Sequence, residues 1–371
     1  MRLIPSRKSS QKRNCPETQL PQGASISHAQ AAFTFEWPSS QHATVAMPPT
    51  IKSMLTQMFP PKPSFTEKDL PDLQGKVYIV TGSNTGAGKE LARLLYSKNA
   101  SIYLLARSED KTNDAIADIR RTCPASNGDM AFLRLDLADL STIKATVDRF
   151  LAAETRLHVL FNNAGVMSPE KKVSKTAQGH ELHFGVNCLG TFVLTELLTP
   201  ILVATARSEP PSTVRVVWVA SSASEMFGKK DIGVEPEALD RPEKRSGIER
   251  YGLSKVGNWA HGVEYARRHR ADGVVSVPLN PGNFDSDLYR EHGTGMKILT
   301  KPMKYPPVNG AYTELFAGLS PDITIEKTGT WGRCPPPGRL LLDDDTKIPS
   351  HPFRSYLSHP RGLKSGNQDR D

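Results

Sequence analysis

The sequence predicts a single α/β domain built on a doubly wound parallel sheet, with disordered tails at both ends. Three observations predict it. Short apolar segments alternate with helical hydrophobic patterns from residue 76 onward, the first apolar segment ends in a glycine-rich turn, and polar motifs follow several of the others. Continuously apolar strands between helices are typical of a sheet covered on both faces. Ligands of such folds bind beyond the carboxyl ends of the strands, where these polar motifs fall.

The hydrophobic pattern assigns strands and helices along the middle of the chain. We expect strands at 76–80, 101–106, 131–135, 159–161, 214–220 and 274–279. Helical spacing of apolar residues predicts helices over 88–99, 111–122, 141–154, 178–206 and 251–270. Ser141 is the expected N-cap of the third helix, and 328–331 is a short candidate for a last strand.

A chain of 371 residues suits one large domain with additional segments at its ends. We divide it into an N-terminal extension over 1–50, a leader over 51–75, the α/β domain over 76–331 and an irregular tail over 332–371. The extension is basic, rich in serine and poor in acidic residues. We expect it to be disordered or to precede the true start site, in a cytoplasmic protein. A mitochondrial transit peptide is the alternative, although prolines interrupt any amphipathic helix there.

Charge and cysteine content argue against several classes of protein. The net charge of +8 is dispersed and comes with no nucleic-acid recognition motif, so we expect no nucleic-acid partner. Four cysteines lie far apart without CxxC spacing, which predicts neither a disulfide framework nor a metal site and fits a reducing compartment. No apolar run approaches the roughly 18 residues of a membrane-spanning helix, so no transmembrane segment is expected.

A glycine turn joins the first expected strand to the first helix. It reads Thr81-Gly82-Ser83-Asn84-Thr85-Gly86-Ala87-Gly88, with GxxxGxG spacing. Glycines permit a tight turn and close approach of the backbone to a pyrophosphate, while the helix N-terminus supplies N–H donors and a positive dipole end. A purely structural turn is the alternative. The place of the turn between strand and helix favours a dinucleotide-binding site of the Rossmann type.

The end of the second expected strand bears on which dinucleotide binds. An NAD site uses an acidic residue there to hold the ribose 2′-hydroxyl, but this chain has Arg107. The planar guanidinium suits a 2′-phosphate, so Arg107 predicts NADP(H) over NAD(H). Asp110 lies nearby but falls at a helix start, where acidic residues are ordinary. A merely solvent-exposed arginine is the alternative interpretation of Arg107.

Tyr251 and Lys255 form a YxxxK pair on the last predicted helix. Their i, i+4 spacing puts both on one helix face. A free phenol titrates near ~10, and a neighbouring ammonium together with the positive ring of an oxidised nicotinamide favours the phenolate. Tyr251 could then take or give a hydroxyl proton. Because YxxxK is common on helices, the pair counts only together with the other motifs.

These motifs together resemble the short-chain dehydrogenase/reductase family of the classical type. The TGxxxGxG turn begins the resemblance, the NNAG string at 162–165 and the YxxxK pair continue it, and it runs over about residues 76–331. The stretches 308–320 and 55–73 carry a narrower likeness to retinol-dehydrogenase-like fungal members. The resemblance implies an NADP-binding catalytic domain over 76–331.

The resemblance implies how each motif would hold the cofactor. Asp136 would bond the adenine amino group, Lys255 would hold the nicotinamide ribose, and Ser286 would bond the carboxamide in place of a more usual threonine. The implied cofactor-binding residues are Thr81, Gly82, Ser83, Asn84, Gly86, Gly88, Arg107, Asp136, Leu137, Asn163, Ala164, Gly165, Tyr251, Lys255, Pro281, Gly282 and Ser286.

The catalytic group that the resemblance implies is Tyr251, Lys255, Ser222 and Asn187. Ser222, rather than Ser221, matches the serine that bonds the substrate oxygen. Asn187 would place a water that links Lys255 to solvent. From the residues alone, Ser222 could equally be a turn or capping residue, and Asn187 a core amide bonded to backbone.

The implied activity is that of an NADP(H)-dependent oxidoreductase that interconverts an alcohol with a ketone or aldehyde on a small hydrophobic substrate, with fungal secondary metabolism as one setting. The alternative is a catalytically weak NADP(H)-binding sensor or regulatory protein with the same fold. Family members are often dimers or tetramers, so a homo-oligomer is a further implication of the resemblance.

The sequence departs from the family pattern in three places. The polar insert over 224–250 is longer than usual and would border the substrate mouth. Phe284 stands where a smaller aliphatic residue is usual, and 284–307 could act as a lid. The likeness fails after Gly332, where the tail reads as turn and disorder.

Overall fold

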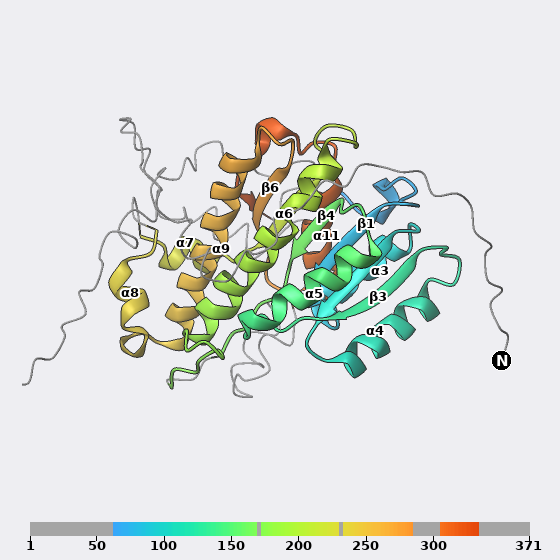
Figure 1. The fold of residues 1–371 in the computed structure, drawn as a ribbon. Coiled ribbons are helices and arrows are strands. Elements are labelled where there is room, and N and C mark those ends of the chain that lie inside the picture. Colours follow the sequence, from blue (N-terminus) through green and yellow to red (C-terminus); the bar gives the residue numbers. More distant parts are fainter. Residues whose placement is uncertain (1–61, 169–171, 230–232, 285–304, 334–371) are drawn as a thin grey trace, which may run out of the picture. The chain divides into compact units, whose positions relative to one another are not determined.

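The computed structural model describes residues 62–168, 172–229, 233–284 and 305–333. Within them, parallel strands form one seven-stranded sheet in the order β3-β2-β1-β4-β5-β6-β7 (Figure 1). The strands are β1 (Val77–Thr81), β2 (Ser101–Ala106), β3 (Asp129–Arg134), β4 (Val159–Asn162), β5 (Arg215–Val219), β6 (Val275–Asn280) and β7 (Gly332–Arg333). The order reverses between β1 and β4, so the sheet is doubly wound and its switch point lies there. The predicted α/β fold class is confirmed.

Helices connect these parallel strands. The long ones are α3 (Gly86–Tyr96), α4 (Glu109–Thr122), α5 (Leu140–Ala153), α6 (Thr191–Ala206), α9 (Gly247–His269) and α11 (Pro307–Leu319). Short helical pieces are η1 (Glu67–Asp69), the π-helix η2 (Phe184–Gly190), α7 (Ala223–Phe227), α8 (Pro236–Asp240), η3 (Pro242–Lys244) and η6 (Ile325–Lys327).

Helices cover both faces of the sheet (Figure 1), because successive side chains of each strand point to opposite faces. On one face, Tyr78 and Val80 of β1 belong to a buried core shared with α3, α4 and α11. On the other face, Val77 and Ile79 belong to a second core shared with α5, α6 and α9. Two cores therefore fix the sheet from both sides and hold the carboxyl ends of its strands in place.

The end of the leader packs onto this domain. Leu70 and Leu73 are buried in the core that includes α11. The ring of Phe65 meets Phe316 edge to face, with centroids 5.6 Å apart, and the Tyr312 hydroxyl donates to Glu67 Oε2 at 2.9 Å. The described part of the leader is thus attached to α11 by apolar and polar contacts.

Two helix starts differ from the prediction. α5 is capped by Asp139, whose carboxylate accepts the N–H of Ser141 at 3.1 Å, so Ser141 is not the N-cap. α9 begins well before Tyr251, because Ser246 and Glu249 form a reciprocal capping box that starts the helix at Gly247. Tyr251 therefore lies inside the helix rather than at its first turn.

Two other boundaries were also predicted wrongly. The last strand is not 328–331, because β7 pairs with β6 through Gly332 and Arg333. The predicted helix over 178–206 begins only near 182–184, since Lys175 and Glu181 form an isolated antiparallel bridge before it. An isolated bridge involves too few residues to produce a periodic hydrophobic pattern in the sequence.

The helical stretch Phe184–Ala206 is long and apolar enough, by length and composition, to cross a membrane. Asn187, Glu196 and several threonines interrupt its apolar residues, so the sequence predicted no transmembrane segment. Half of its most apolar window is buried inside the structure, where Leu194, Leu198 and Leu202 belong to the core beneath the sheet. A buried core helix passes the same test of length and composition, so this finding alone is weak evidence for a membrane span.

Leu315 of α11 provides a test of how α11 is held. Its side chain is fully buried in the core shared with β1 and α3, so Leu315→Ala should lower the free energy of unfolding by about 2–5 kcal/mol. Leu151 on α5 is 42% exposed, and Leu151→Ala serves as the matched control with little expected effect. Urea unfolding midpoints measure both. Equal losses in the two variants would contradict the packing described here.

Candidate active site

The glycine turn follows β1 and enters α3 directly. Gly82 and Gly86 both adopt left-handed φ angles, of 65° and 58°, which side chains other than glycine rarely tolerate. A Cβ at Gly88 would lie 2.4 Å from Asn163 Nδ2 and 2.6 Å from the Gly82 carbonyl oxygen. Glycine is therefore required at these positions by backbone conformation and by close approach.

The NNAG string after β4 is bonded to this turn. The Asn163 amide donates to the Thr81 carbonyl at 2.8 Å, and the Ala164 N–H donates to Thr81 Oγ1 at 2.9 Å. A Cβ at Gly82 would lie 3.0 Å from Ala164 Cα. The two loops therefore approach each other closely, at the switch point of the sheet.

The start of α3 offers free donors to an anion. Its N-cap residue, Thr85, makes no side-chain capping bond, so the N–H groups of the first turn remain available. Ser83 Oγ is fully buried and has no hydrogen-bond partner among the described residues. An uncapped helix start and an orphaned hydroxyl beside left-handed glycines fit a pyrophosphate group.

Arg107 and Asp136 follow β2 and β3 at the same edge of the sheet. Arg107 comes directly after Ala106, is exposed, and is followed by Ser108, the N-cap of α4. Asp136 Oδ1 accepts the Ala138 N–H at 2.9 Å in a tight turn. Asp110 lies in the first turn of α4, where the prediction placed it as an ordinary helix-start acid. Each role toward a cofactor remains a prediction.

Tyr251 and Lys255 lie together on α9. Lys255 Nζ is 5.9 Å from the centroid of the Tyr251 ring, and both side chains are almost fully buried. Lys255 Nζ donates to the Val219 carbonyl at the end of β5 at 2.7 Å. A Cβ at Gly165 would lie 3.1 Å from Lys255 Nζ. The amine is thus close to the NNAG loop and to the phenol, as the YxxxK spacing requires.

Burial governs the charge of Lys255. Desolvation lowers the pKa of its ammonium to about 8, while interactions with Cys188 and Glu314 act in the opposite direction. A pKa of about 8 leaves the amine mostly protonated at neutral pH. The site therefore holds a positive charge in a poorly solvated position beside a phenol, which favours ionisation of the phenol.

Asn187 and Ser222 take different places around this pair. Asn187, in η2, accepts the Val166 N–H at 2.8 Å and donates to Ser254 Oγ at 2.9 Å. Its side chain is therefore committed to protein partners, as in the core-amide interpretation. Ser222 stands at the N-cap position of α7 but makes no side-chain capping bond there. Ser221 Oγ instead accepts the Ala223 N–H at 3.2 Å.

Pro281 and Gly282 follow β6 at the same end of the sheet. Gly282 has a left-handed φ of 87°, and its N–H donates to Asn280 Oδ1 at 3.2 Å. Phe284 packs close to Gly310 of α11, where a Cβ would lie 2.7 Å from the ring. Ser286, and with it most of the predicted lid over 284–307, lies outside the described residues.

Comparison with known proteins identifies this arrangement. A family profile described as short chain dehydrogenase matches residues 76–230. The short-chain dehydrogenase/reductase sthC of Phaeosphaeria nodorum is 53% identical over 76% of this chain and 90% of its own length. A short-chain dehydrogenase/reductase of Phomopsis amygdali is 54% identical over 76% of this chain and 87% of its own. The chain belongs to the short-chain dehydrogenase/reductase family.

Two solved structures share the fold of this short-chain dehydrogenase/reductase. The RhlG/NADP active-site complex of Pseudomonas aeruginosa matches with a TM-score of 0.56 and 20% identity, over 74% of this chain and 98% of that chain. The 3-oxoacyl-[acyl-carrier protein] reductase of Brucella melitensis in complex with NAD gives 0.54 and 24%, over 71% and 96%. One binds NADP and the other NAD, so the shared fold does not select the cofactor.

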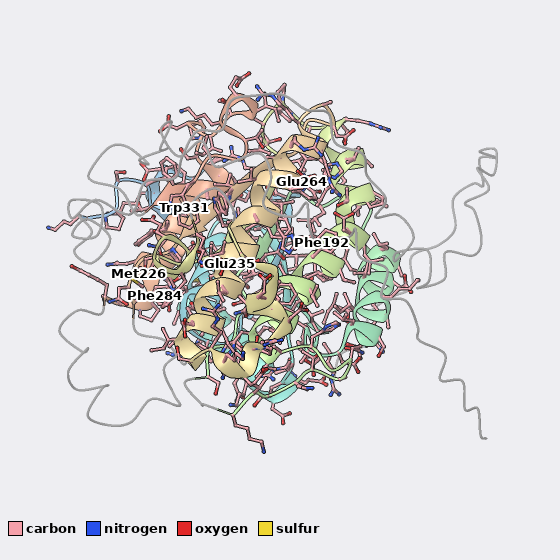
Figure 2. All side chains as sticks on the ribbon, turned by 90° about the vertical axis from the view of Figure 1, so that its left-hand side faces the viewer. Phe192, Met226, Glu235, Glu264, Phe284 and Trp331 are labelled. Atoms are coloured by element: carbon pink, nitrogen blue, oxygen red, sulfur yellow. The ribbon has the colours of Figure 1, made fainter. Side chains whose placement is uncertain are left out.

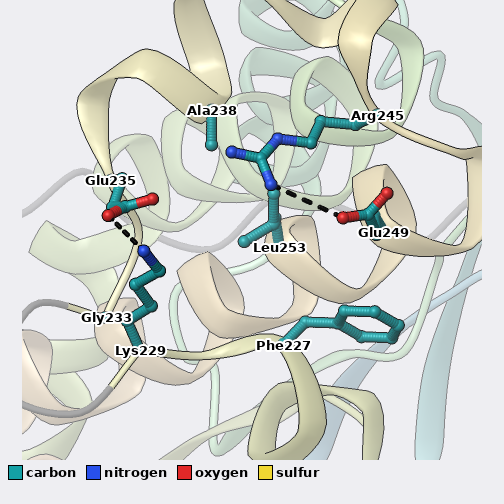
Figure 3. Close-up of a pocket in the computed structure, with 8 residues that line it drawn as sticks. All are labelled: Phe227, Lys229, Gly233, Glu235, Ala238, Arg245, Glu249 and Leu253. Atoms are coloured by element: carbon teal, nitrogen blue, oxygen red, sulfur yellow. Dashed lines mark hydrogen bonds and ion pairs between the residues drawn. The ribbon is translucent and has the colours of Figure 1, made fainter.

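The insert of this family member is partly helical. With the start of α9, α7 and α8 form a pocket lined by Phe227, Lys229, Gly233, Glu235, Ala238, Arg245, Glu249 and Leu253 (Figure 3). Two ion pairs line it, Lys229 with Glu235 and Arg245 with Glu249. None of the predicted catalytic or cofactor-binding residues lines this pocket.

The insert also presents an apolar side chain to solvent. Met226 of α7 is 56% exposed, and Figure 2 shows it on the same side of the view as Phe284, away from Phe192 and Glu264. Trp331 Nε1 donates to Glu225 Oε1 at 2.9 Å and thereby connects the insert to the residue that precedes β7. That the insert borders the substrate mouth stays a prediction.

Glu314 is one of the buried ionisable residues that the sequence analysis did not single out. Glu314 of α11 is fully buried, and neither carboxyl oxygen has a hydrogen-bond partner among the described residues. Burial raises the pKa of this carboxyl to about 8, although the positive charge of Lys255 acts to lower it. A single glutamate inside an apolar helix was the available signal, because such a residue is seldom fully buried without a partner.

Glu314 makes the stability of the protein depend on pH. Its pKa in the folded protein lies above the ordinary value of 4.5, so between about pH 4.5 and 8 the unfolded chain loses a proton that the folded one keeps, and stability falls as pH rises. Glu314→Gln should remove this loss. Urea unfolding of both proteins at pH 5 and pH 8.5 measures it, and an unchanged pH dependence in the variant would contradict the assignment.

Proposed function

We propose that this short-chain dehydrogenase/reductase is an NADP(H)-dependent enzyme that interconverts an alcohol with a ketone or aldehyde on a small hydrophobic substrate. The observation that carries the proposal is the buried pair of Tyr251 and Lys255, with Lys255 Nζ 5.9 Å from the phenol ring and beside the NNAG loop. The setting that we propose is fungal secondary metabolism, and the fungal origin of the similar short-chain dehydrogenase/reductases supports it.

The residues of the turn would hold the cofactor. The N–H groups at the start of α3 and the orphaned Ser83 hydroxyl suit the pyrophosphate, and Lys255 suits a ribose hydroxyl. A nicotinamide cofactor supplies or accepts the hydride when bound. All other chemistry falls to the side chains of this chain.

Tyr251 would move the proton of the reaction. In the reductive direction its phenol gives a proton to the substrate oxygen, and in the oxidative direction the phenolate takes one from the alcohol. Lys255 stabilises the phenolate by its charge, in a position where poor solvation strengthens the interaction. Ser222, which makes no side-chain capping bond at the start of α7, would bond the substrate oxygen and orient it.

Arg107 supports NADP(H) as the cofactor. It stands exposed directly after β2, where an acid would hold the 2′-hydroxyl of NAD, and its guanidinium can form paired hydrogen bonds with a 2′-phosphate. The competing acid, Asp110, lies in the first turn of α4, where an acidic residue is favourable to the helix itself. Free Cys123 and Cys188 among the described residues accord with the reducing cytoplasm as compartment.

The second candidate function is a sensor that holds NADP(H) without turnover. It is favoured only by the commitment of Asn187 to Val166 and Ser254, which occupies both N–H donors of its side chain and one of the two acceptor sites of its oxygen. Retention of Tyr251 and Lys255 argues for the enzyme.

Tyr251→Phe tests the chemistry. With NADPH and a panel of aldehydes and ketones, it should lower turnover at least about 100-fold, because the proton donor is lost, while fluorescence titration shows NADPH binding largely kept. Tyr265→Phe is the matched control on the same helix, where the hydroxyl contacts Thr199 at 3.0 Å, and it should keep activity. Binding of NADPH by wild type with no consumption favours the sensor, and undiminished turnover in Tyr251→Phe refutes the mechanism.

Arg107→Asp tests the cofactor. The substitution removes the partner of the 2′-phosphate and offers a carboxylate to a 2′-hydroxyl, so the ratio of NADPH to NADH affinity should fall at least about tenfold. Arg149→Asp, an equal charge change on the exposed face of α5, is the control. Dissociation constants from fluorescence titration measure both, and an unchanged ratio in Arg107→Asp would overturn the assignment.

A further inference from the structure

A buried charged cluster lies beside Tyr251 and is not used by the mechanism above. It consists of Glu181, His183 and Arg250, whose side chains are at most 9% exposed. His183 Nδ1 lies 2.6 Å from Glu181 Oε1, and Arg250 Nε lies 3.4 Å from the same oxygen. The rings of His183 and Tyr251 meet edge to face with centroids 6.3 Å apart. The cluster is thus in contact with the phenol that would move the proton.

The hydrogen bonds of His183 fix its protonation state. The Ser168 N–H donates to His183 Nε2 at 2.9 Å. A backbone N–H can only donate, so Nε2 carries no proton and the remaining proton is on Nδ1, from which it is donated to Glu181. His183 is therefore a neutral imidazole with both nitrogens occupied.

Glu181 is held as the charged acceptor of this arrangement. Its Oε2 accepts the Phe184 N–H at 2.9 Å, and Arg250 lies at Oε1. Burial alone would raise the pKa of Glu181, whereas the hydrogen bonds from His183 and from backbone N–H groups act to lower it. The carboxylate thus keeps the Nδ1–H form of His183 in place.

The helical segment that contains His183 also contains Asn187, and these two side chains bind the chain after NNAG at two neighbouring points. Asn187, one helical turn beyond His183, accepts the Val166 N–H at 2.8 Å and donates to the Val166 carbonyl at 3.1 Å. His183 accepts from Ser168, two residues further along. The two side chains together fix the path by which the chain leaves the cofactor loop and passes the phenol.

We propose that His183 is a positioning residue for the reaction: as a neutral imidazole it holds Ser168 and so fixes the segment 166–168 beside Tyr251, and protonation of the ring releases that segment. A protonated imidazole has two N–H donors and cannot accept from Ser168. The titratable or charged groups that face the ring are Glu181, two residues before it in the chain, and Arg250 and Tyr251 on α9. The effect of His183 on catalysis rests on the proposed function, whereas its bond to Ser168 does not.

Two variants separate the hydrogen bond from the bulk of the ring. His183→Gln keeps an acceptor for Ser168 and a donor for Glu181 but does not titrate. His183→Leu keeps the bulk and loses both bonds. His180→Leu, an exposed histidine close by in sequence, is the matched control. Arg250 and Glu181 remain unchanged in all three.

Hydrogen exchange in the absence of cofactor and substrate tests the proposal directly. In the peptide that contains Ser168, His183→Leu should exchange at least about tenfold faster than wild type, while His183→Gln and His180→Leu should match wild type. After correction for intrinsic rates, wild type should lose this protection once the ring is protonated and can no longer accept from Ser168, and His183→Gln should keep it at every pH. Equal protection in His183→Leu, or the same pH-dependent loss in His183→Gln, would overturn the proposal.

Catalysis supplies the second readout. With the carbonyl substrate from the panel, wild type should lose kcat/KM on the acid side through one protonation that His183→Gln lacks, while NADPH affinity stays unchanged in both. Persistence of that acid limb in His183→Gln also refutes the proposal. Should wild type reduce no carbonyl at all, the proposed function fails, while the exchange experiment still decides the role of His183. If His183→Leu does not fold, the comparison of wild type with His183→Gln across pH decides it.

Discussion

The site depends on a single ammonium group held out of water. Lys255 donates to the Val219 carbonyl at the end of β5. Its Nζ also lies so close to Gly165 that a Cβ on that residue would be only 3.1 Å from it. One contact therefore joins α9, the fifth strand and the loop after the fourth. Because a charge in such a place is poorly solvated, its field acts strongly on the neighbouring phenol. The fold can be understood as the scaffold that brings these segments together.

The loops at the switch point serve the same end from the cofactor side. Thr81 accepts through its carbonyl and through its hydroxyl from the NNAG loop, so the end of β1 and the loop after β4 form one unit. Left-handed glycines leave the start of α3 open above that unit. A pyrophosphate at the helix start and a ribose at Lys255 would then be placed by one rigid set of backbone atoms, which is how preorganised sites avoid the entropic cost of assembly.

Much of this was readable from the sequence because it is local. Apolar strands, helical periodicity and the GxxxGxG and YxxxK spacings depend on residues near one another in the chain, and they predicted the doubly wound sheet and the face of α9 that carries Tyr251 and Lys255. Helix starts were less accessible, since Asp139 and Ser246 compete with neighbouring polar residues as caps. Contacts between distant segments left no periodic signal. The bond from Ser168 to His183, the orphaned Ser83 and the solitary Glu314 all depend on how separate elements pack.

Titration of the phenol in the presence of oxidised cofactor tests the central claim most directly. The difference in ultraviolet absorbance between wild type and a protein without the Tyr251 hydroxyl isolates ionisation of that one group. We predict an apparent pKa well below the ~10 of a free phenol, moving back toward that value when Lys255 is replaced by Met. A phenol pKa near ~10 both in wild type and in the Lys255 variant would mean that the buried amine does not act on the phenol, and would contradict the account.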